Sequence, residues 1–600
     1  MIADVAFDAP VDHPFSYRVP GGLCVAPGQR VWAPLRGAAR VGMIIAVRDG
    51  GDAALKALAR PADPAPVLPP GGLELARWIS AESLSPLGST CAALLPPPPV
   101  PAGAGGSPSV RGPRAASGSK PVLLLGGGRE RRLLEQIERT GGPALIIAPD
   151  VEASARWARH LARLGRVARL DSGVPDVERA TSWRALADGA VRLATGTRSA
   201  LLAPLGAGAM VAVLDEQEAA HKPPGPPRIH ARDVCLERAA REGVALALTA
   251  ATPSVETWWR ADSGRIVAEP AQAGPWPTVT LADTRGILRR EPLTPPLARA
   301  IREALAAGRR VFLGVSRLAS SLACDECGDV VRCAECRIAL AYSRAAATLV
   351  CRLCARPGPL PDTCPACHGR RLSPFGWGTE RVEHAVRRRF PGARIARYDP
   401  DAARGARGEA QRAAAAVADV VIGTRAALRL FGPATLGLAG FVAPDQLLRL
   451  PDFRAGERTF ALLWAAAERV RPDGAVIVQS QNPTHYVFDA LTRQDLPAFY
   501  RHELKFRAEL GYPPFRRLAV VSVRGAAAEG HRLAAALGEV PGLTVYPATA
   551  DRRGRLVRVV VKGGPDLPEF LRRVRADFRG PGSRRLGIMD VEVDPVEWRS

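Results

Sequence analysis

The chain has 600 residues, of which 47% are hydrophobic and 24% charged, an ordinary composition for a globular protein with several cores. The formal charge of +23 favours an anionic partner such as nucleic acid. Only five of the basic residues are lysines, however, and a GC-rich genome, which encodes many arginines, would also raise the net charge. We expect a cytoplasmic protein, because the start MIADVAFDAP lacks signal-peptide character and no uncharged stretch is long and proline-free enough to cross a membrane.

Residues 1–100 predict a small β-rich domain. Short apolar runs separated by proline and glycine turns indicate strands, and a helical pattern follows at Leu73–Ser80. The runs are Val5–Phe7, Gln29–Trp32 and Val41–Val47. Residues 101–120 are rich in proline, glycine and serine, which is the composition of a linker.

Two series of apolar runs, within 121–275 and 276–498, alternate with helical patterns. This alternation predicts βαβ units and therefore two parallel sheets that are buried on both faces. The first series comprises 122–125, 144–148, 191–195, 210–214 and 244–249, and the second comprises 311–315, 394–398, 418–423, 440–443 and 475–479. Residues 499–600 mix strand-like runs with helical patterns and predict a separate α+β domain.

Eight of the eleven cysteines lie within 44 residues of the second series, which favours metal binding over disulfides in so large a chain. They form four Cys-x2-Cys pairs, and eight thiolates are the number that two closed tetrahedral zinc sites need. An iron–sulfur cluster also uses cysteine, but paired knuckles are typical of zinc ribbons. The spacing therefore predicts two structural zinc ions in an insertion at 322–370.

Several segments resemble, in the same order, motifs of the superfamily-2 helicase core of the PriA family. They are GTRSA (196–200), MVAVLDEQEAAHK (210–222), RIHARDV (228–234), AATPSVE (250–256), GWGTERVE (376–383), LPDFRAGERTF (450–460) and GYPPF (511–515). FSYRVPGGLCVAPGQRV (15–31) resembles the family's domain that grips a DNA 3′ end.

The resemblance covers nearly the whole chain. It implies an α/β fold with two tandem RecA-like helicase lobes and a zinc-binding insertion, an N-terminal β-rich DNA-binding domain and a C-terminal α+β domain. We expect one zinc ion to be bound by Cys324, Cys327, Cys364 and Cys367, and the other by Cys333, Cys336, Cys351 and Cys354.

The family's ATP-binding loop is decayed in this chain. Such a loop needs glycines that expose backbone N–H groups, a lysine for the phosphates and a Ser/Thr hydroxyl for magnesium. Here Gly126, Gly127 and Gly128 remain, but the Lys-Thr pair is missing. Arg129 can contact a phosphate but cannot supply the hydroxyl, so ATP and Mg²⁺ are doubtful cofactors.

Three remnants of the motor remain. Asp215 and Glu216 stand where the family has its magnesium-binding Asp and water-orienting Glu, although acidic residues at a strand end fit equally well. Arg469 is left from the arginine-finger helix, where the family's QVAGRAGR appears as AAAERVRP (465–472). The loss of several phosphoryl-transfer groups together predicts negligible turnover, with no catalytic residue in use.

The predicted DNA-binding residues are Phe15, Ser16 and Tyr17, where the family has an aromatic–Asp–aromatic trio that receives the terminal nucleotide of a leading strand. Aromatic faces stack on bases without sequence preference. Ser16 replaces the carboxylate, and the alternative is that both rings are core residues of a small barrel. The family's winged-helix domain is missing, and only the linker 101–120 occupies its place.

The sequence therefore predicts a non-motor, zinc-containing DNA-binding protein that acts at stalled or branched forks and helps to assemble a primosome. The expected partners are branched and single-stranded DNA, primosome and helicase-loading proteins, and single-strand-binding protein, in a bacterial cytoplasm at the nucleoid. Two alternatives stay open: an active ATP-dependent 3′-to-5′ helicase, and a zinc-stabilised scaffold with little DNA binding.

Overall fold

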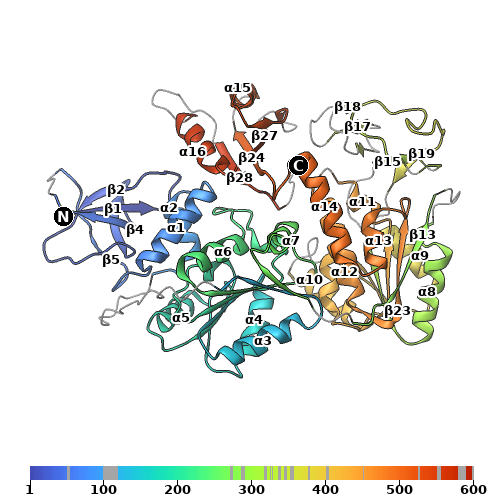
Figure 1. Ribbon diagram of the computed structural model, residues 1–600, viewed down its shortest axis with the longest axis horizontal. Coiled ribbons are helices and arrows are strands. Elements are labelled where there is room, and N and C mark those ends of the chain that lie inside the picture. The colour runs from blue at the N-terminus through green and yellow to red at the C-terminus, as the bar shows by residue number, and fades with distance from the viewer. Residues whose placement is uncertain are drawn as a thin grey trace. The chain divides into compact units, whose positions relative to one another are not determined.

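The computed structural model describes most of the chain, in two compact units. The described residues are 1–50, 54–98, 119–270, 274–285, 291–315, 321–324, 326–327, 329–334, 340–343, 348–351, 357–375, 379–399, 405–450, 452–524, 527–550, 556–578 and 589–596. The first unit comprises Met1–Ala271, Arg516–Tyr546 and Arg558–Val596, and the second is formed mainly by Gln272–Phe515. Figure 1 labels the elements of both units.

The N-terminal part of the first unit is an antiparallel sheet followed by two helices. The strands, in the order β2-β1-β4-β3-β5, are β1 (Ile2–Phe7), β2 (Phe15–Arg18), β3 (Arg30–Leu35), β4 (Ala38–Arg48) and β5 (Arg60–Pro61). The helices are α1 (Pro70–Glu82) and α2 (Leu87–Leu94). A Cβ atom at Gly88 would lie 2.0 Å from the carbonyl oxygen of Phe7, so only glycine permits α2 to approach β1 this closely.

The first α/β lobe contains a seven-stranded sheet in which each neighbouring pair is parallel. Its strands, in the order β12-β6-β11-β10-β7-β9-β8, are β6 (Val122–Leu125), β7 (Ala144–Ile147), β8 (Val167–Arg169), β9 (Leu193–Gly196), β10 (Met210–Val213), β11 (Ala245–Ala250) and β12 (Val267–Glu269). The helices are α3 (Arg129–Thr140), α4 (Val151–Leu161), α5 (Asp176–Ala187), η1 (Arg198–Ala200), η2 (Ala219–His221), α6 (Ala231–Glu242) and α7 (Val255–Asp262).

Two hydrophobic clusters form the core of this lobe. One contains Leu124, Ile146 and Ala212, and the other contains Leu123, Leu145 and Val211. Because alternate strand residues point to opposite faces, the two clusters lie on opposite faces of the sheet. The second cluster also includes Ile79 of α1 and Leu94 of α2, so the N-terminal helices share a core with the lobe.

The C-terminal segments of the first unit form a small α+β domain. Its sheet runs in the order β25-β27-β24-β28, with β24 (Arg517–Arg524), β25 (Thr544–Val545), β27 (Leu556–Gly563) and β28 (Met589–Val593). The helices are α15 (Ala527–Gly538) and α16 (Leu567–Phe578). The short strand β26 (Thr549–Ala550) belongs to 547–557, which are assigned to the second unit.

The second unit contains the other parallel sheet, in the order β13-β23-β22-β14-β21-β20. Its strands are β13 (Thr278–Asp283), β14 (Arg310–Gly314), β20 (Ile395–Tyr398), β21 (Val420–Gly423), β22 (Leu436–Val442) and β23 (Val470–Ser480). The helices are α8 (Pro295–Ala306), α9 (Thr379–Arg389), α10 (Ala406–Val417), η3 (Arg425–Leu430), α11 (Asp445–Leu448), α12 (Ala455–Ala467), α13 (Tyr486–Thr492) and α14 (Leu496–Leu510).

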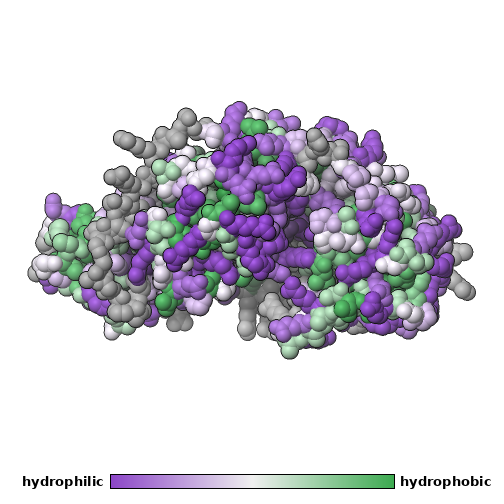
Figure 2. All heavy atoms as spheres, turned by 90° about the horizontal axis from the view of Figure 1, so that it is seen from below, coloured by the Kyte–Doolittle hydropathy of each residue, from purple (hydrophilic) through white to green (hydrophobic). Residues whose placement is uncertain are grey.

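The cysteine-rich insertion follows β14 and contains two small sheets. One pairs β15 (Ser321–Cys324) with β19 (Leu372–Phe375), and the other joins β16 (Ala341–Ser343), β17 (Thr348–Val350) and β18 (Pro357–Gly358). None of the described helices is both long and apolar enough to cross a membrane. Figure 2 shows hydrophilic side chains over most of the face that it draws, with hydrophobic residues in separate smaller groups.

The predicted fold class is confirmed: two parallel α/β sheets, an N-terminal β-rich domain and a C-terminal α+β domain. All ten apolar runs of the two series overlap strands. The predicted linker 101–120 lies almost wholly outside the described residues, and the predicted domain boundary at 498/499 falls inside the continuous helix α14. The predicted domain boundaries stay a prediction.

Candidate functional site

The glycine loop Gly126–Gly128 connects β6 to α3 in the first lobe. Gly126 and Gly128 have φ values of 73° and 68°, which favour glycine, and Gly128 precedes the first residue of α3. A Cβ atom at Gly127 or Gly128 would meet nothing within 4 Å. The turn therefore positions a helix N-terminus beside the sheet, and the loop 126–128 carries neither a lysine nor a Ser/Thr hydroxyl.

Arg129, the first residue of α3, binds Asp215 at the end of β10. Its Nε and Nη2 atoms donate to one carboxylate oxygen at 3.2 and 3.1 Å, and Nη1 donates to the carbonyl oxygen of Gly126 at 3.1 Å. The two side chains are 19% and 26% exposed. Asp215, the predicted metal-binding remnant, therefore already has a tethered cation beside its carboxylate.

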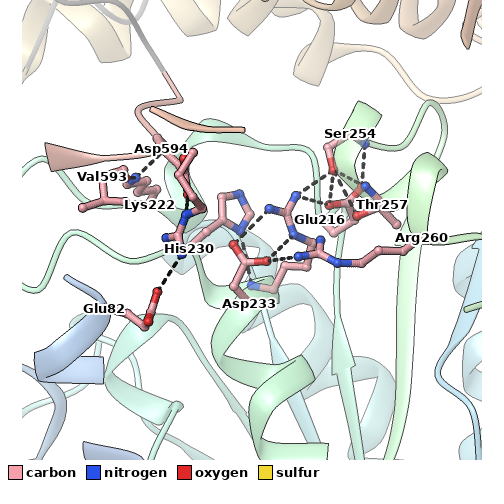
Figure 3. Close-up of polar contacts among 12 residues, drawn as sticks. Glu82, Glu216, Lys222, His230, Asp233, Ser254, Thr257, Arg260, Val593 and Asp594 are labelled. Carbon is pink, nitrogen blue, oxygen red and sulfur yellow. Dashed lines mark hydrogen bonds and ion pairs between the residues drawn. The ribbon is translucent and has the colours of Figure 1, made fainter. Parts of the chain in front are cut away.

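Glu216 is completely buried and its carboxylate is fully used within the lobe (Figure 3). It accepts hydrogen bonds from the main-chain N–H of Ser254 at 2.7 Å, from the Ser254 hydroxyl at 3.0 Å and from Arg232 Nη1 at 3.1 Å. Ser254 in turn caps α7 by accepting from the Thr257 N–H. These contacts tie the end of β10 to the AATPSVE segment, so Glu216 holds the lobe together in this arrangement.

Arg232 extends this network to Asp233, which also binds Arg260 at 3.1 Å (Figure 3). Burial opposes ionisation of Asp233, but the two guanidinium groups hold its pKa well below the usual range. Burial lowers the pKa of the neighbouring His230, so the segment RIHARDV combines a neutral imidazole with an ion pair whose carboxylate is partly exposed.

Arg469, which the sequence predicts to be left from an arginine-finger helix, follows the end of α12. Its guanidinium donates to the carbonyl oxygens of Leu428 at 2.8 Å, Phe431 at 3.1 Å and Ala465 at 2.6 Å. These carbonyls lie at the C-terminal ends of η3 and α12, where helices leave main-chain acceptors that side chains can satisfy. Arg469 thus caps two helices of the second unit.

The trio Phe15–Tyr17 lies on β2, and its two rings face the core of the N-terminal sheet. Tyr17 is 4% exposed and donates its hydroxyl to the carbonyl oxygen of Pro34 at 2.9 Å. Phe15 is half-buried and contacts the rings of Phe7 and His13. Only Phe15 of the two aromatic residues leaves part of its ring accessible, and its contact with DNA stays a prediction.

Ser16 points to the opposite face of the sheet, where it meets two charged residues. Its hydroxyl donates to Asp4 at 2.6 Å, and Arg48 Nη2 donates to the Ser16 hydroxyl at 3.3 Å. Arg48 also pairs with Asp4 at 3.4 Å. The strand pairing explains the contact, because Asp4 of β1 lies directly opposite Ser16 of β2.

Four cysteines of the insertion converge at one point. The sulfur atoms of Cys324, Cys327, Cys364 and Cys367 all lie within 4.8 Å of one another, with Sγ–Sγ distances of 3.6 Å for Cys324–Cys367 and 3.7 Å for Cys327–Cys364. Four sulfurs bound at about 2.3 Å to a tetrahedral zinc ion would lie about 3.8 Å apart. The geometry therefore fits a metal ion of that size and coordination.

The main chain around this cluster favours thiolates. The N–H groups of Glu326, Asp329 and Ala366 point to the sulfurs of Cys324, Cys327 and Cys364 at 3.4, 3.5 and 3.4 Å. Such donors stabilise negative charge on sulfur, which metal binding requires. The neighbouring His368 has a left-handed φ of 59°, which is typical of a turn.

The second predicted zinc set is only partly described. Cys333 and Cys351 are buried in one hydrophobic cluster with Leu322, Leu340 and Leu349. Cys336 and Cys354 lie outside the described residues, so this set stays a prediction.

Contacts between the C-terminal domain and the rest of the first unit were not foreseen from sequence. Lys222 is 6% exposed and donates to the carbonyl oxygens of Val593 and Asp594 at the end of β28 (Figure 3). Arg517 bridges Asp594 at 2.6 Å and Glu82 of α1 at 3.0 Å. The contacts of Lys222 and the Arg517–Glu82 pair join residues between 371 and 435 positions apart, and nothing in local sequence signals them.

Comparisons with known proteins agree with this architecture. Residues 4–96 match the family model of the PriA 3′DNA-binding domain (3′BD). The chain is 32% identical over 421 residues to the replication restart protein PriA of Bacillus subtilis, covering 67% of this chain and 52% of that protein. It is 28% identical over 663 residues to the replication restart protein PriA of Treponema pallidum, covering 99% of each.

Solved structures with a similar course of the chain include RecG bound to a three-way DNA junction, at 11% identity and a TM-score of 0.36, covering 65% of this chain and 47% of that chain. Another is the Escherichia coli DExH-box NTPase HrpB, at 14% identity and a TM-score of 0.34, covering 60% and 39%. Both likenesses are distant.

The two parallel sheets, the acidic end of β10 and the inserted cysteine cluster define a helicase-like protein with two RecA-like lobes. With the N-terminal domain match and relatives along the whole chain, it belongs to the PriA family. In the match to the Bacillus subtilis relative, the chain spans about half of that protein's length, at 52%.

Proposed function

We propose that this chain is a non-motor member of its family: a zinc-containing DNA-binding protein of replication restart. It would recognise branched or stalled forks and the single-stranded DNA on them. It would then help to assemble the proteins that load the replicative helicase, with single-strand-binding protein as a further partner. Support comes from its relatives, which are replication restart proteins, and from its N-terminal match to a 3′DNA-binding domain.

The Arg129–Asp215 pair is the observation that carries the non-motor part of the proposal. ATP hydrolysis needs a metal ion on this carboxylate and a lysine and hydroxyl on the loop before α3. Here the loop supplies an arginine, and that arginine is bound to the carboxylate at 3.1 Å. A guanidinium adds positive charge, but it has no lone pair for magnesium and no hydroxyl. The Arg129–Asp215 pair would therefore stabilise the fold of the lobe and would not support ATP hydrolysis.

Binding to DNA would combine arginine–phosphate contacts with base stacking. The net charge of +23 supplies the long-range attraction. In the N-terminal domain, Phe15 offers a part-exposed ring, and Arg48 and Ser16 lie together on the other face of the same sheet. The fold of the insertion would be stabilised by one zinc ion, bound by Cys324, Cys327, Cys364 and Cys367. A second zinc ion at the remaining four cysteines of the insertion would stabilise the rest of its fold.

One zinc-loaded preparation tests both parts of the proposal. We expect submicromolar binding to forked DNA that weakens steeply with added salt, because each phosphate contact releases counterions. We expect no DNA-stimulated ATP hydrolysis above background. A DNA helicase of known ATPase activity, assayed in parallel, shows whether the forks and conditions support turnover.

Each alternative has its own signature in this experiment. Turnover of about one ATP per second or more would replace the proposal with an active helicase. Absence of fork binding by a folded, zinc-loaded chain would replace it with a protein scaffold. Binding without hydrolysis supports the proposal.

A further inference from the structure

Helix α14 carries an exposed ridge of apolar and aromatic side chains that the proposed function does not use. The ridge, called here the α14 ridge, consists of His502, Phe506 and Leu510, which are four residues apart and therefore share one face of the helix. All three side chains are exposed; Phe506 is 38% and Leu510 is 52% exposed. Large apolar residues in a row on the surface are unusual and mark binding surfaces.

Two stacks of parallel rings end at this ridge. Tyr486 lies against His502 with a centroid distance of 5.2 Å and an interplanar angle of 25°. Tyr512 lies 6.1 Å from Phe506 at 22° and 4.6 Å from Phe453 at 5°. Most ring pairs in the N-terminal core are steeply tilted, for example Phe7 and Tyr17 at 66°. Near-parallel rings that end at an exposed ring resemble a base stack that a further planar group can extend.

A buried polar network holds both stacks in place. Arg507 is 0% exposed and binds Glu457 at 2.8 Å and Glu503 at 3.3 Å. Glu503 also accepts from the Tyr486 hydroxyl at 2.7 Å, which ties the first stack to the network. The guanidinium of Arg507 lies 5.1 Å from the centroid of the Phe453 ring in the second stack. A surface fixed in this way loses little conformational entropy when a ligand binds.

This network also explains why two sequence motifs come together. Phe453 and Glu457 belong to LPDFRAGERTF, and Tyr512 belongs to GYPPF. At Gly456, a Cβ atom would lie 2.3 Å from the carboxylate of Glu503 and 2.6 Å from the Tyr486 hydroxyl, so the network needs glycine there. Both motifs therefore support one surface on α14.

The charges beside the ridge favour an anionic, base-bearing ligand. Arg501 and Lys505 are exposed on the same helix, next to His502 and Phe506. The contact of Lys505 with Glu509 is long, at 3.9 Å, and both side chains are more than half exposed, so the ammonium group keeps most of its solvent access. Aromatic faces flanked by cations are the usual composition of single-strand binding surfaces.

We propose that the α14 ridge is a stacking surface for the unpaired bases of single-stranded DNA, with Phe506 and His502 contacting bases and Arg501 and Lys505 contacting phosphates. This inference rests on the proposed DNA-binding function and adds a contact in the second unit, apart from the N-terminal domain. The expected ligand of the α14 ridge is therefore DNA, and the experiment below distinguishes DNA from a protein partner.

The experiment compares the full zinc-loaded chain with Phe506→Ala, Phe506→Trp and the control Val417→Ala, which removes an exposed apolar side chain from α10. Three DNA probes are used: a single-stranded oligothymidine, the same strand with abasic sites, and a fork with fully duplex arms. We expect Phe506→Ala to weaken binding to the oligothymidine about five- to tenfold, because one ring–base stack contributes an effect of this order. Phe506→Trp should restore the affinity.

The other probes separate stacking from general DNA affinity. Binding to the abasic strand and to the duplex fork should change less than twofold in Phe506→Ala, because neither offers a base to this ring. Equal affinity of Phe506→Ala and the parent chain for the oligothymidine would overturn the inference and leave the surface for a protein partner. An equal loss on the abasic strand would also overturn it. Failure of every variant to bind any probe would instead refute the proposed function.

Discussion

Arg129 forms an internal ion pair with the carboxylate of Asp215 at the end of β10. Its guanidinium supplies Asp215 with the positive charge that a metal ion would bring, and it also satisfies the carbonyl oxygen of Gly126. The pair is less than a third exposed, so its attraction is only partly screened by solvent. Because the cation is part of the chain, it needs no nucleotide to stay in place.

We expect Arg129→Ala to leave the Asp215 carboxylate free to bind a metal ion. The free energy of unfolding should fall by about 1 kcal/mol, because a charged hydrogen-bonded pair is lost. Millimolar Mg²⁺ should then raise the melting temperature of Arg129→Ala but not that of the parent chain. The double variant Arg129→Ala, Asp215→Asn is the control, because removing the carboxylate should abolish the Mg²⁺ effect. An equal effect of Mg²⁺ on the parent chain would contradict this account.

The limits of sequence reasoning also appear at single residues. The positions of Asp215 and Glu216 at a strand end follow from the apolar run before them, and the structure places them there. Their partners Arg129 and Ser254 depend on the order of β6, β10 and β11 in the sheet, which periodicity does not give. Likewise, the alternation on β2 puts Phe15 and Tyr17 on one face, but only the register with β1 shows that Ser16 meets Asp4.

At the scale of elements, strands buried on both faces were predictable and exposed ones were not. The central strands are continuous apolar runs, whereas β12 (Val267–Glu269) is exposed along its length and β8 has only three residues. The cysteine-rich insertion was predictable for a different reason than the buried strands. It has only a small hydrophobic cluster, and its fold depends on ligand spacing that the sequence displays directly.

We therefore expect removal of one ligand to unfold part of the insertion. Cys364→Ser should lower the zinc content by about one ion per chain, because a closed site does not retain its metal with three thiolates. It should also expose 321–375 to proteolysis while the two lobes stay resistant, because site formation and local folding are linked. Cys235→Ala, at a buried cysteine of α6, is the control and should leave zinc content unchanged. Unaltered zinc content in Cys364→Ser would count against the assigned ligands.

At the scale of the whole molecule, charged side chains join distant parts of the first unit. Arg575 of α16 binds Asp12 at 2.7 Å, and Arg517 links Asp594 to Glu82 of α1. Lys222, six residues beyond the acidic remnant Glu216, holds the last strand of the C-terminal domain. These ion pairs and hydrogen bonds connect the N-terminal domain, the first lobe and the C-terminal domain within the first unit.

The contact of Lys222 should decide how firmly the C-terminal domain is held. In Lys222→Met the side chain keeps its apolar stem but loses its three donors, which leaves the carbonyl oxygens of Val593 and Asp594 without this partner. An unsatisfied buried acceptor costs about 1–3 kcal/mol, so opening of β28 should become about fivefold or more frequent. Hydrogen exchange would report this as faster exchange in 589–594, with the central strands of the first lobe unchanged. Lys120→Met, at an exposed lysine before β6, is the matched control. If both variants exchanged at the parent rate in 589–594, Lys222 would not hold β28, and other contacts, such as the ion pairs of Arg517 and Arg575, would attach the C-terminal domain.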